Sequence, residues 1–190
     1  MEDRLQLSKG SIEVIPNGVN LRSYQVGKPK RRIGYLARQN EIKGLGLLVD
    51  AYIHLNDPSV ELAIAGTMAG ADAGYVSTLK EKLFEAGLAE HVSWHANLDL
   101  EEKATFLASL AVFSVPAIYP EAFGLYLVEA MASGIPVVMP RSSAFPEVLE
   151  SSGAGLLVEP KNHVALAEGC LLYTSPSPRD ATLSRMPSSA

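Results

Sequence analysis

The sequence predicts an α/β fold, a Rossmann-like parallel sheet with helices on both of its faces. Short apolar runs alternate along the chain with stretches whose apolar residues recur every three or four positions. The runs are typical of buried strands, and the periodic stretches are typical of amphipathic helices. Alternation of the two indicates right-handed βαβ units and therefore a parallel sheet. With 190 residues and 47 % hydrophobic side chains, the chain can bury one sizeable core.

The expected strands are short apolar runs bounded by turn residues. They cover residues 12–15, 32–37, 60–65, 91–94, 112–115, 136–139 and 155–158. The first run ends at the turn Pro16-Asn17-Gly18, and the run 60–65 is closed by Gly66.

The expected helices lie between these strands. They cover residues 45–55, 75–86, 99–110, 125–133 and 145–150, and a last helix begins at Asn162. Asp99, with Glu102 three positions later, is a capping signal for the helix that follows it.

Composition argues against several classes of function. The net charge of −5 argues against broad nucleic-acid binding, which needs a basic face. The sequence has no apolar run of the roughly 20 residues that span a bilayer, and its start lacks the order of a signal peptide. The short basic run at 28–32 is typical of a solvated entry to a strand, and it allows at most a peripheral contact with an acidic membrane surface. A single cysteine makes a reducing, cytoplasmic location the default expectation.

No cofactor or metal is expected. The sequence contains neither a Gly-rich dinucleotide fingerprint nor a P-loop, so hydride transfer and NTP hydrolysis lose support. His91 and His95 would share one face of a strand, but no third metal ligand lies near them in the sequence.

The chemistry of such a sheet is expected in the loops that follow its strands, because ligands bind beyond the carboxyl ends of parallel strands. Residues 121–129 occupy one of these loops and the helix after it. Glu121 and Glu129 can accept hydrogen bonds from sugar and ribose hydroxyls, and Gly124 opens the helix so that a phosphate can reach bare backbone N–H groups. The alternative is two solvated glutamates around an ordinary turn.

A second loop gathers cations in an acidic chain. Arg38 and Lys43 lie between a strand and a helix, where Arg can grip a diphosphate in bidentate fashion and Lys adds a point charge. A solvated turn with ordinary surface charges is the alternative. Gly66 follows the next strand, where a backbone passes close to a ligand, although a plain turn glycine has the same pattern.

From Cys170 onward Pro and Ser become dense and no apolar period continues. Residues 170–190 resemble the translation of a sequencing-library adapter. They are therefore expected to be a non-native, disordered tail, which leaves residues 1–169 as a nucleotide-sugar-binding domain truncated at its end.

Together, several motifs resemble the C-terminal half of a retaining glycosyltransferase of family four, with the GT-B fold. The motifs are Pro16-Asn17-Gly18-Val19, Arg38 with Lys43-Gly44, Ile64-Ala65-Gly66, Glu121-Ala122-Phe123-Gly124, Glu129-Ala130-Met131-Ala132-Ser133-Gly134-Ile135-Pro136-Val137 and Pro146-Glu147-Val148. They are collinear and cover residues 11–169. Ala117 departs from the pattern, since a serine often follows the proline there.

The resemblance implies a role for each site residue. Arg38 and Lys43 would stabilise the leaving nucleoside diphosphate without a metal ion. The backbone of Phe123, Gly124 and Leu125 would hold phosphate or sugar hydroxyls, and Gly66 would border the donor. Glu121 would contact the transferred sugar, and Glu129 would contact the ribose.

The resemblance also implies what the chain does not contain. In the GT-B fold an N-terminal domain carries the acceptor site, so this chain is expected to bind a nucleotide-diphospho-sugar and not to transfer the sugar alone. The alternatives are a non-catalytic nucleotide-sugar-binding module and a GT-B epimerase or phosphorylase.

Overall fold

The computed structural model describes residues 15 and 17–175 and confirms the predicted α/β class. Within these residues, six parallel strands form one sheet in the order β3-β2-β1-β4-β5-β6. The strands are β1 Arg32–Leu36, β2 Glu61–Ala65, β3 Val92–His95, β4 Val112–Phe113, β5 Val137–Pro140 and β6 Gly155–Val158. This order is that of a doubly wound Rossmann sheet, in which the strand sequence reverses direction once.

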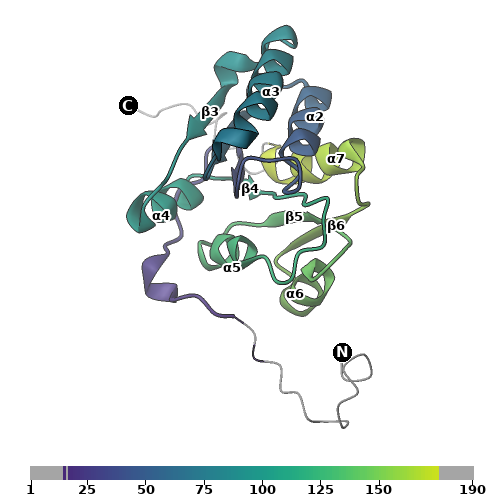
Figure 1. Cartoon of the computed structure of the whole chain (residues 1–190). Coiled ribbons are helices and arrows are strands. Elements are labelled where there is room, and N and C mark those ends of the chain that lie inside the picture. Colours follow the sequence, from purple (N-terminus) through teal and green to yellow (C-terminus); the bar gives the residue numbers. More distant parts are fainter. Residues whose placement is uncertain (1–14, 16, 176–190) are drawn as a thin grey trace, which may run out of the picture.

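Helices cover both faces of the sheet. They are α2 Leu45–Leu55, α3 Ala73–Glu85, α4 Leu100–Ala108, α5 Leu125–Ala132, α6 Phe145–Ser152 and α7 His163–Thr174. Figure 1 shows α2, α3 and α7 on one side of the sheet and α4, α5 and α6 on the other. Short 3₁₀ turns lie at Leu21–Ser23 (η1), Gly70–Asp72 (η2) and Ala89–His91 (η3).

The core lies between the sheet and these two helical layers. Tyr35 and Phe113 from the central strands, Tyr52 from α2 and Phe145 from α6 are fully buried. Burial of a large apolar side chain contributes about 1.5–3 kcal/mol, so these positions hold the layers together. The buried Tyr52 hydroxyl is satisfied, because it donates to the carbonyl of Val60 at 2.6 Å.

The structure contains the other predicted strands and helices, with their ends shifted by a few residues. Strand β4 is shorter than the expected 112–115, yet the chain beyond it stays bound to the sheet. The Ser114 N–H donates to the Gly34 carbonyl at 2.9 Å, and its hydroxyl donates to the Val138 carbonyl at 2.6 Å. Of the strand expected at 12–15, residues 12–14 lie outside the described residues.

The expectation of a disordered tail from residue 170 is wrong for residues 170–175. Helix α7 continues to Thr174, and Arg31 Nε donates to the Thr174 carbonyl at 2.7 Å. Leu166, Cys170 and Thr174 are each 1 % exposed and four residues apart, so they extend one helical stripe past the point where proline density suggested a break. Residues 176–190 lie outside the described residues.

None of the helices in residues 15–175 is both long and apolar enough to cross a bilayer.

Candidate functional site

The strand order reverses between β1 and β4, and the loops after these two strands lie side by side. The Ile118 N–H in the loop after β4 donates to the Ile42 carbonyl in the loop after β1 at 3.0 Å. The loop after β1 is also tied to the loop after β2, because the Gln39 N–H donates to the Thr67 carbonyl at 2.9 Å. The reversal point of such a sheet is where a ligand crevice forms.

Two glycines allow these loops to pack backbone against backbone. Gly44 has φ +74°, and a Cβ there would lie 1.9 Å from the Pro116 carbonyl oxygen in the loop after β4. Gly66 has φ +127°, and its Cβ would lie 2.0 Å from the Ala37 carbonyl oxygen. No side chain fits at either position, so the closeness of the three loops requires glycine at both.

Lys43 and Glu121 meet across this reversal point. Lys43 Nζ forms an ion pair with Glu121 Oε2, and the Tyr126 hydroxyl donates to the same oxygen at 3.0 Å. The two charged side chains are 29 % and 16 % exposed. Burial, followed by the Glu121 charge, raises the Tyr126 pKa well above its usual value, so Tyr126 stays a hydrogen-bond donor.

Helix α5 begins directly beside this pair. Gly124 is its N-cap in a left-handed conformation, and no side chain caps the first turn. A Cβ on Gly124 would lie 3.5 Å from the Glu121 Cγ. The first N–H groups of α5 therefore lack side-chain partners next to a lysine, which is an arrangement suited to an anion.

Arg38 lies in the same loop as Lys43 but makes a different ion pair. Its Nε donates to Asp72 Oδ2 at 2.8 Å, and Asp72 comes from the turn η2 between β2 and α3. The guanidinium beside it, together with the Ala69 N–H, lowers the pKa of the Asp72 carboxyl. Among the described residues, Asp72 is the acidic partner of Arg38, whereas Glu121 is that of Lys43.

Glu129 lies within α5, about one and a half turns after Gly124. It is 8 % exposed, and its Oε1 accepts hydrogen bonds from the Tyr24 hydroxyl at 2.9 Å and from Lys103 Nζ at 2.6 Å. Burial lowers the Lys103 pKa, but the hydrogen bond and charge of Glu129 outweigh it and raise that pKa overall. Glu129 thus joins α5 to α4 and to the segment before β1.

Four of these partners were not assigned from the sequence, and one of them, Tyr126, lies within residues 121–129 themselves. Tyr24, Asp72 and Lys103 are each far from the residue they bind in the chain. Asp72 alone left a local signal, since it begins a helix next to the loop after β2.

Two hollows of similar size lie in the described residues, and one adjoins the predicted site. A cavity of about 680 Å³ is bordered by Phe123 and Ala122 on the loop before α5, and by Asn17, Ala144 and Glu147. Phe123 is thus a predicted site residue that borders this hollow.

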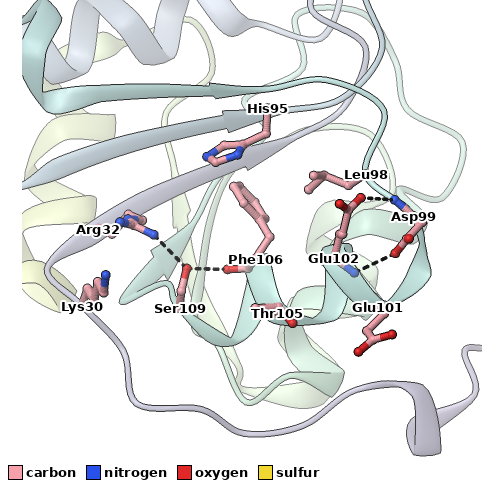
Figure 2. Close-up of a pocket in the computed structure, with 10 residues that line it drawn as sticks. All are labelled: Lys30, Arg32, His95, Leu98, Asp99, Glu101, Glu102, Thr105, Phe106 and Ser109. Atoms are coloured by element: carbon pink, nitrogen blue, oxygen red, sulfur yellow. Dashed lines mark hydrogen bonds between the residues drawn. The ribbon is translucent and has the colours of Figure 1, made fainter.

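The other hollow, of about 630 Å³, lies under α4 and away from the predicted site (Figure 2). In Figure 2, Arg32 Nη1 donates to the Ser109 hydroxyl at 3.2 Å, and Asp99 and Glu102 form the capping box of α4. His95 and Phe106 make an edge-to-face contact with their ring centroids 5.6 Å apart.

Comparison with known proteins places the chain in a family. The family model described as "Glycosyl transferases group 1" matches residues 20–183. The chain belongs to this family. A phosphatidyl-myo-inositol mannosyltransferase of Mycobacterium leprae is 35 % identical to it over 172 residues, which cover 85 % of this chain and 44 % of the relative. An MMP alpha-(1->4)-mannosyltransferase of Mycolicibacterium hassiacum is 34 % identical, over 77 % of this chain and 35 % of the relative.

Solved structures of other proteins share the fold. The Anabaena protein Alr3699/HepE, in complex with UDP and glucose, matches with a TM-score of 0.78 and 23 % identity, over 91 % of this chain and 50 % of that protein. The C-terminal domain of the group 1 protein LpcC from Francisella tularensis matches with a TM-score of 0.70 and 24 % identity, over 90 % of this chain and 89 % of that domain. The sheet thus corresponds to the C-terminal domain of a GT-B protein, and the chain spans less than half the length of the two mannosyltransferases.

Proposed function

We propose that this chain is the donor-binding half of a retaining glycosyltransferase that uses a nucleotide-diphospho-sugar. The observation that carries the proposal is the Lys43–Glu121 pair, which lies at the reversal point of the sheet beside the uncapped start of α5. A cation and free N–H groups suit a diphosphate, and a neighbouring carboxylate suits the hydroxyls of a sugar. Membership of the glycosyl transferases group 1 family supports the same assignment.

In the proposed complex Lys43 exchanges its partner. In the structure its ammonium group is paired with Glu121. A bound diphosphate would take over that ammonium group, and the freed Glu121 oxygens would accept hydrogen bonds from the transferred sugar. Lys43 and Arg38 would then stabilise the negative charge that develops on the leaving nucleoside diphosphate, with no metal ion or cofactor required. The backbone N–H groups around Phe123, Gly124 and Leu125 would bind phosphate oxygens.

Glu129 would receive the ribose hydroxyls in this proposal. Both hydrogen bonds described for its carboxylate fall on Oε1, which leaves Oε2 for a hydroxyl donor. Gly66 would border the donor, because its lack of a side chain lets the loop after β2 pack closely against the loop after β1. The acceptor would bind to a further domain, since the relatives are more than twice as long as the part that this chain matches. The intact enzyme would act in the cytoplasm, with at most a peripheral membrane contact.

The proposal is tested by calorimetric titration of the chain with UDP, GDP and ADP. We expect one of them to bind, and Lys43→Met to weaken that binding about 10- to 100-fold, since a hydrogen bond to a charged group contributes about 1.5–3 kcal/mol. Lys82→Met is the matched control, because Lys82 forms an exposed ion pair with Asp50 and not with a predicted site residue. If a folded chain binds none of the three, or if both variants lose affinity equally, the proposed site is wrong.

A separate experiment tests whether Glu121 takes part in sugar transfer. In the full-length parent protein, Glu121→Ala should abolish most sugar transfer while nucleoside diphosphate binding persists. Unchanged transfer would favour the non-catalytic module or another role for Glu121.

A further inference from the structure

We infer that Asp72 is a positioning residue for the diphosphate: its carboxylate holds one edge of Arg38 so that the other edge of the guanidinium faces the site. The inference rests on the proposed function and goes beyond it, because Asp72 belongs to no motif of the site. It gives the turn η2 a part in donor binding.

The contact between the two side chains has a defined geometry. Arg38 Nε donates to Asp72 Oδ2 at 2.8 Å. The same oxygen accepts the Ala69 N–H at 3.2 Å, so the carboxylate is itself held by the backbone. The Asp72 side chain is only 13 % exposed, while that of Arg38 is 49 % exposed. The fixed Asp72 carboxylate therefore binds the Arg38 guanidinium, which remains partly exposed to solvent.

Asp72 also does not cap helix α3, although it occupies the N-cap position of that helix. It is the N-cap residue of α3, where an aspartate commonly accepts an N–H from the first turn. Here the side chain makes no such capping bond to α3. Its carboxylate instead accepts hydrogen bonds from the Ala69 N–H and from Arg38 Nε, so these contacts fix the loop segments and do not cap α3.

The backbone on either side of the pair is fixed as well. Gln39, next to Arg38, is 5 % exposed and donates from Nε2 to the Gly66 carbonyl at 3.0 Å. Its N–H donates to the Thr67 carbonyl at 2.9 Å. The loop after β1 and the loop after β2 are thereby held in register, and Arg38 and Asp72 project from two tied segments.

The arrangement suits recognition of a diphosphate. A guanidinium carries five N–H donors in a planar fork, and Asp72 occupies only the one on Nε. The structure gives the two Nη groups no hydrogen-bond partner among the described residues, and together they form the edge that binds phosphate in bidentate fashion. Since a free Arg side chain must lose rotamer freedom on binding, holding it in advance favours the ligand. The opposite effect, competition between Asp72 and the ligand for Arg38, would reverse the sign of the result.

The test compares Asp72→Ala and Asp72→Asn with the unaltered chain. The ligands are UDP or GDP, whichever the unaltered chain binds more tightly, and the corresponding nucleoside. We expect Asp72→Ala to weaken the diphosphate about three- to tenfold and to leave the nucleoside unaffected. Asp72→Asn, which can still accept the Ala69 N–H, should keep the fold and show part of the loss. Asp50→Asn, which alters the exposed pair with Lys82, is the control and should change neither affinity.

A double-mutant cycle with Arg38→Ala separates positioning from a structural role. In the Arg38→Ala background, Asp72→Ala should cause no further loss of diphosphate affinity. An equal loss in both backgrounds, an unchanged affinity, or tighter binding by Asp72→Ala would overturn the inference while the proposed function stands. Failure of the unaltered chain to bind either diphosphate would overturn the proposed function and the inference with it.

Discussion

Replacement of Gly44 by alanine is expected to destabilise the protein more than the same change at other left-handed glycines. Gly44 ends the loop after β1 and begins α2, with φ +74°. Its missing Cβ lies 1.9 Å from the Pro116 carbonyl oxygen, and contacts below 3.0 Å essentially never occur for a real Cβ. The two backbones would have to separate by about 1.1 Å, the difference between these two values.

The magnitude has two parts. A left-handed conformation costs an L-residue roughly 1–2 kcal/mol relative to glycine. Separation of two packed backbones costs roughly 1–3 kcal/mol more, as for other overpacked sites. The sum, about 2–5 kcal/mol, is a large part of the 5–15 kcal/mol by which domains are typically stable. Because the same loop carries Lys43, the change should also weaken nucleoside diphosphate binding.

Gly153 and Gly87 provide matched controls. They have φ +63° and +69°, and no atom lies within 4 Å of a Cβ built on either one. Gly153→Ala and Gly87→Ala should therefore cost only the conformational part, about 1–2 kcal/mol. Urea unfolding followed by circular dichroism gives the free energy of unfolding of each variant. A Gly44→Ala loss no greater than that of the two controls would refute the close packing of these loops.

Three further outcomes are expected. Asp99→Ala should lower the free energy of unfolding by about 1 kcal/mol, because Asp99 Oδ1 accepts the Glu102 N–H at 2.9 Å as the cap of α4; a loss below 0.3 kcal/mol by urea unfolding would contradict this role. Glu129→Gln should cost about 1–3 kcal/mol in the same assay, since Lys103 loses the charge of its buried partner, and an unchanged stability would show the pair to be dispensable. Burial raises the pKa of the Cys170 thiol to about 12, from an unfolded value of 9.0. Its contribution to stability is therefore complete below about pH 9 and is lost as the pH rises toward 12, and iodoacetamide should label the thiol at pH 8 only after unfolding, so rapid labelling of the folded chain would be inconsistent with the burial.

The order of the fold could be predicted because it depends on local patterns. Apolar runs and helical spacing located the strands and helices within a few residues, and the alternation of the two implied a parallel sheet. The rule that ligands bind at the carboxyl edge then brought Lys43 and Glu121 to one place, and the structure joins them directly.

The partners of the site residues could not be predicted, because they are set by tertiary contact. Glu129 is bound by Tyr24 and Lys103 from two other elements, which makes it a structural link between α4 and α5 as well as a ribose candidate. Arg38 is paired with Asp72 and not with an anion near Lys43. Neither contact leaves a spacing in the sequence that a local rule could detect.

The sequence placed the end of the domain too early for a related reason. Composition changes at Cys170, but helix α7 continues because Cys170 and Thr174 still pack into the core. A packed stripe of small and apolar side chains outweighed the onset of a proline-rich segment.

A crystal structure of this chain with bound UDP or GDP tests the central claim most directly. The account predicts phosphate oxygens within about 3 Å of Lys43 Nζ and of a backbone N–H in the first turn of α5, with the Lys43–Glu121 ion pair opened. A nucleotide bound instead in the hollow under α4, with Lys43 still paired to Glu121, would contradict it.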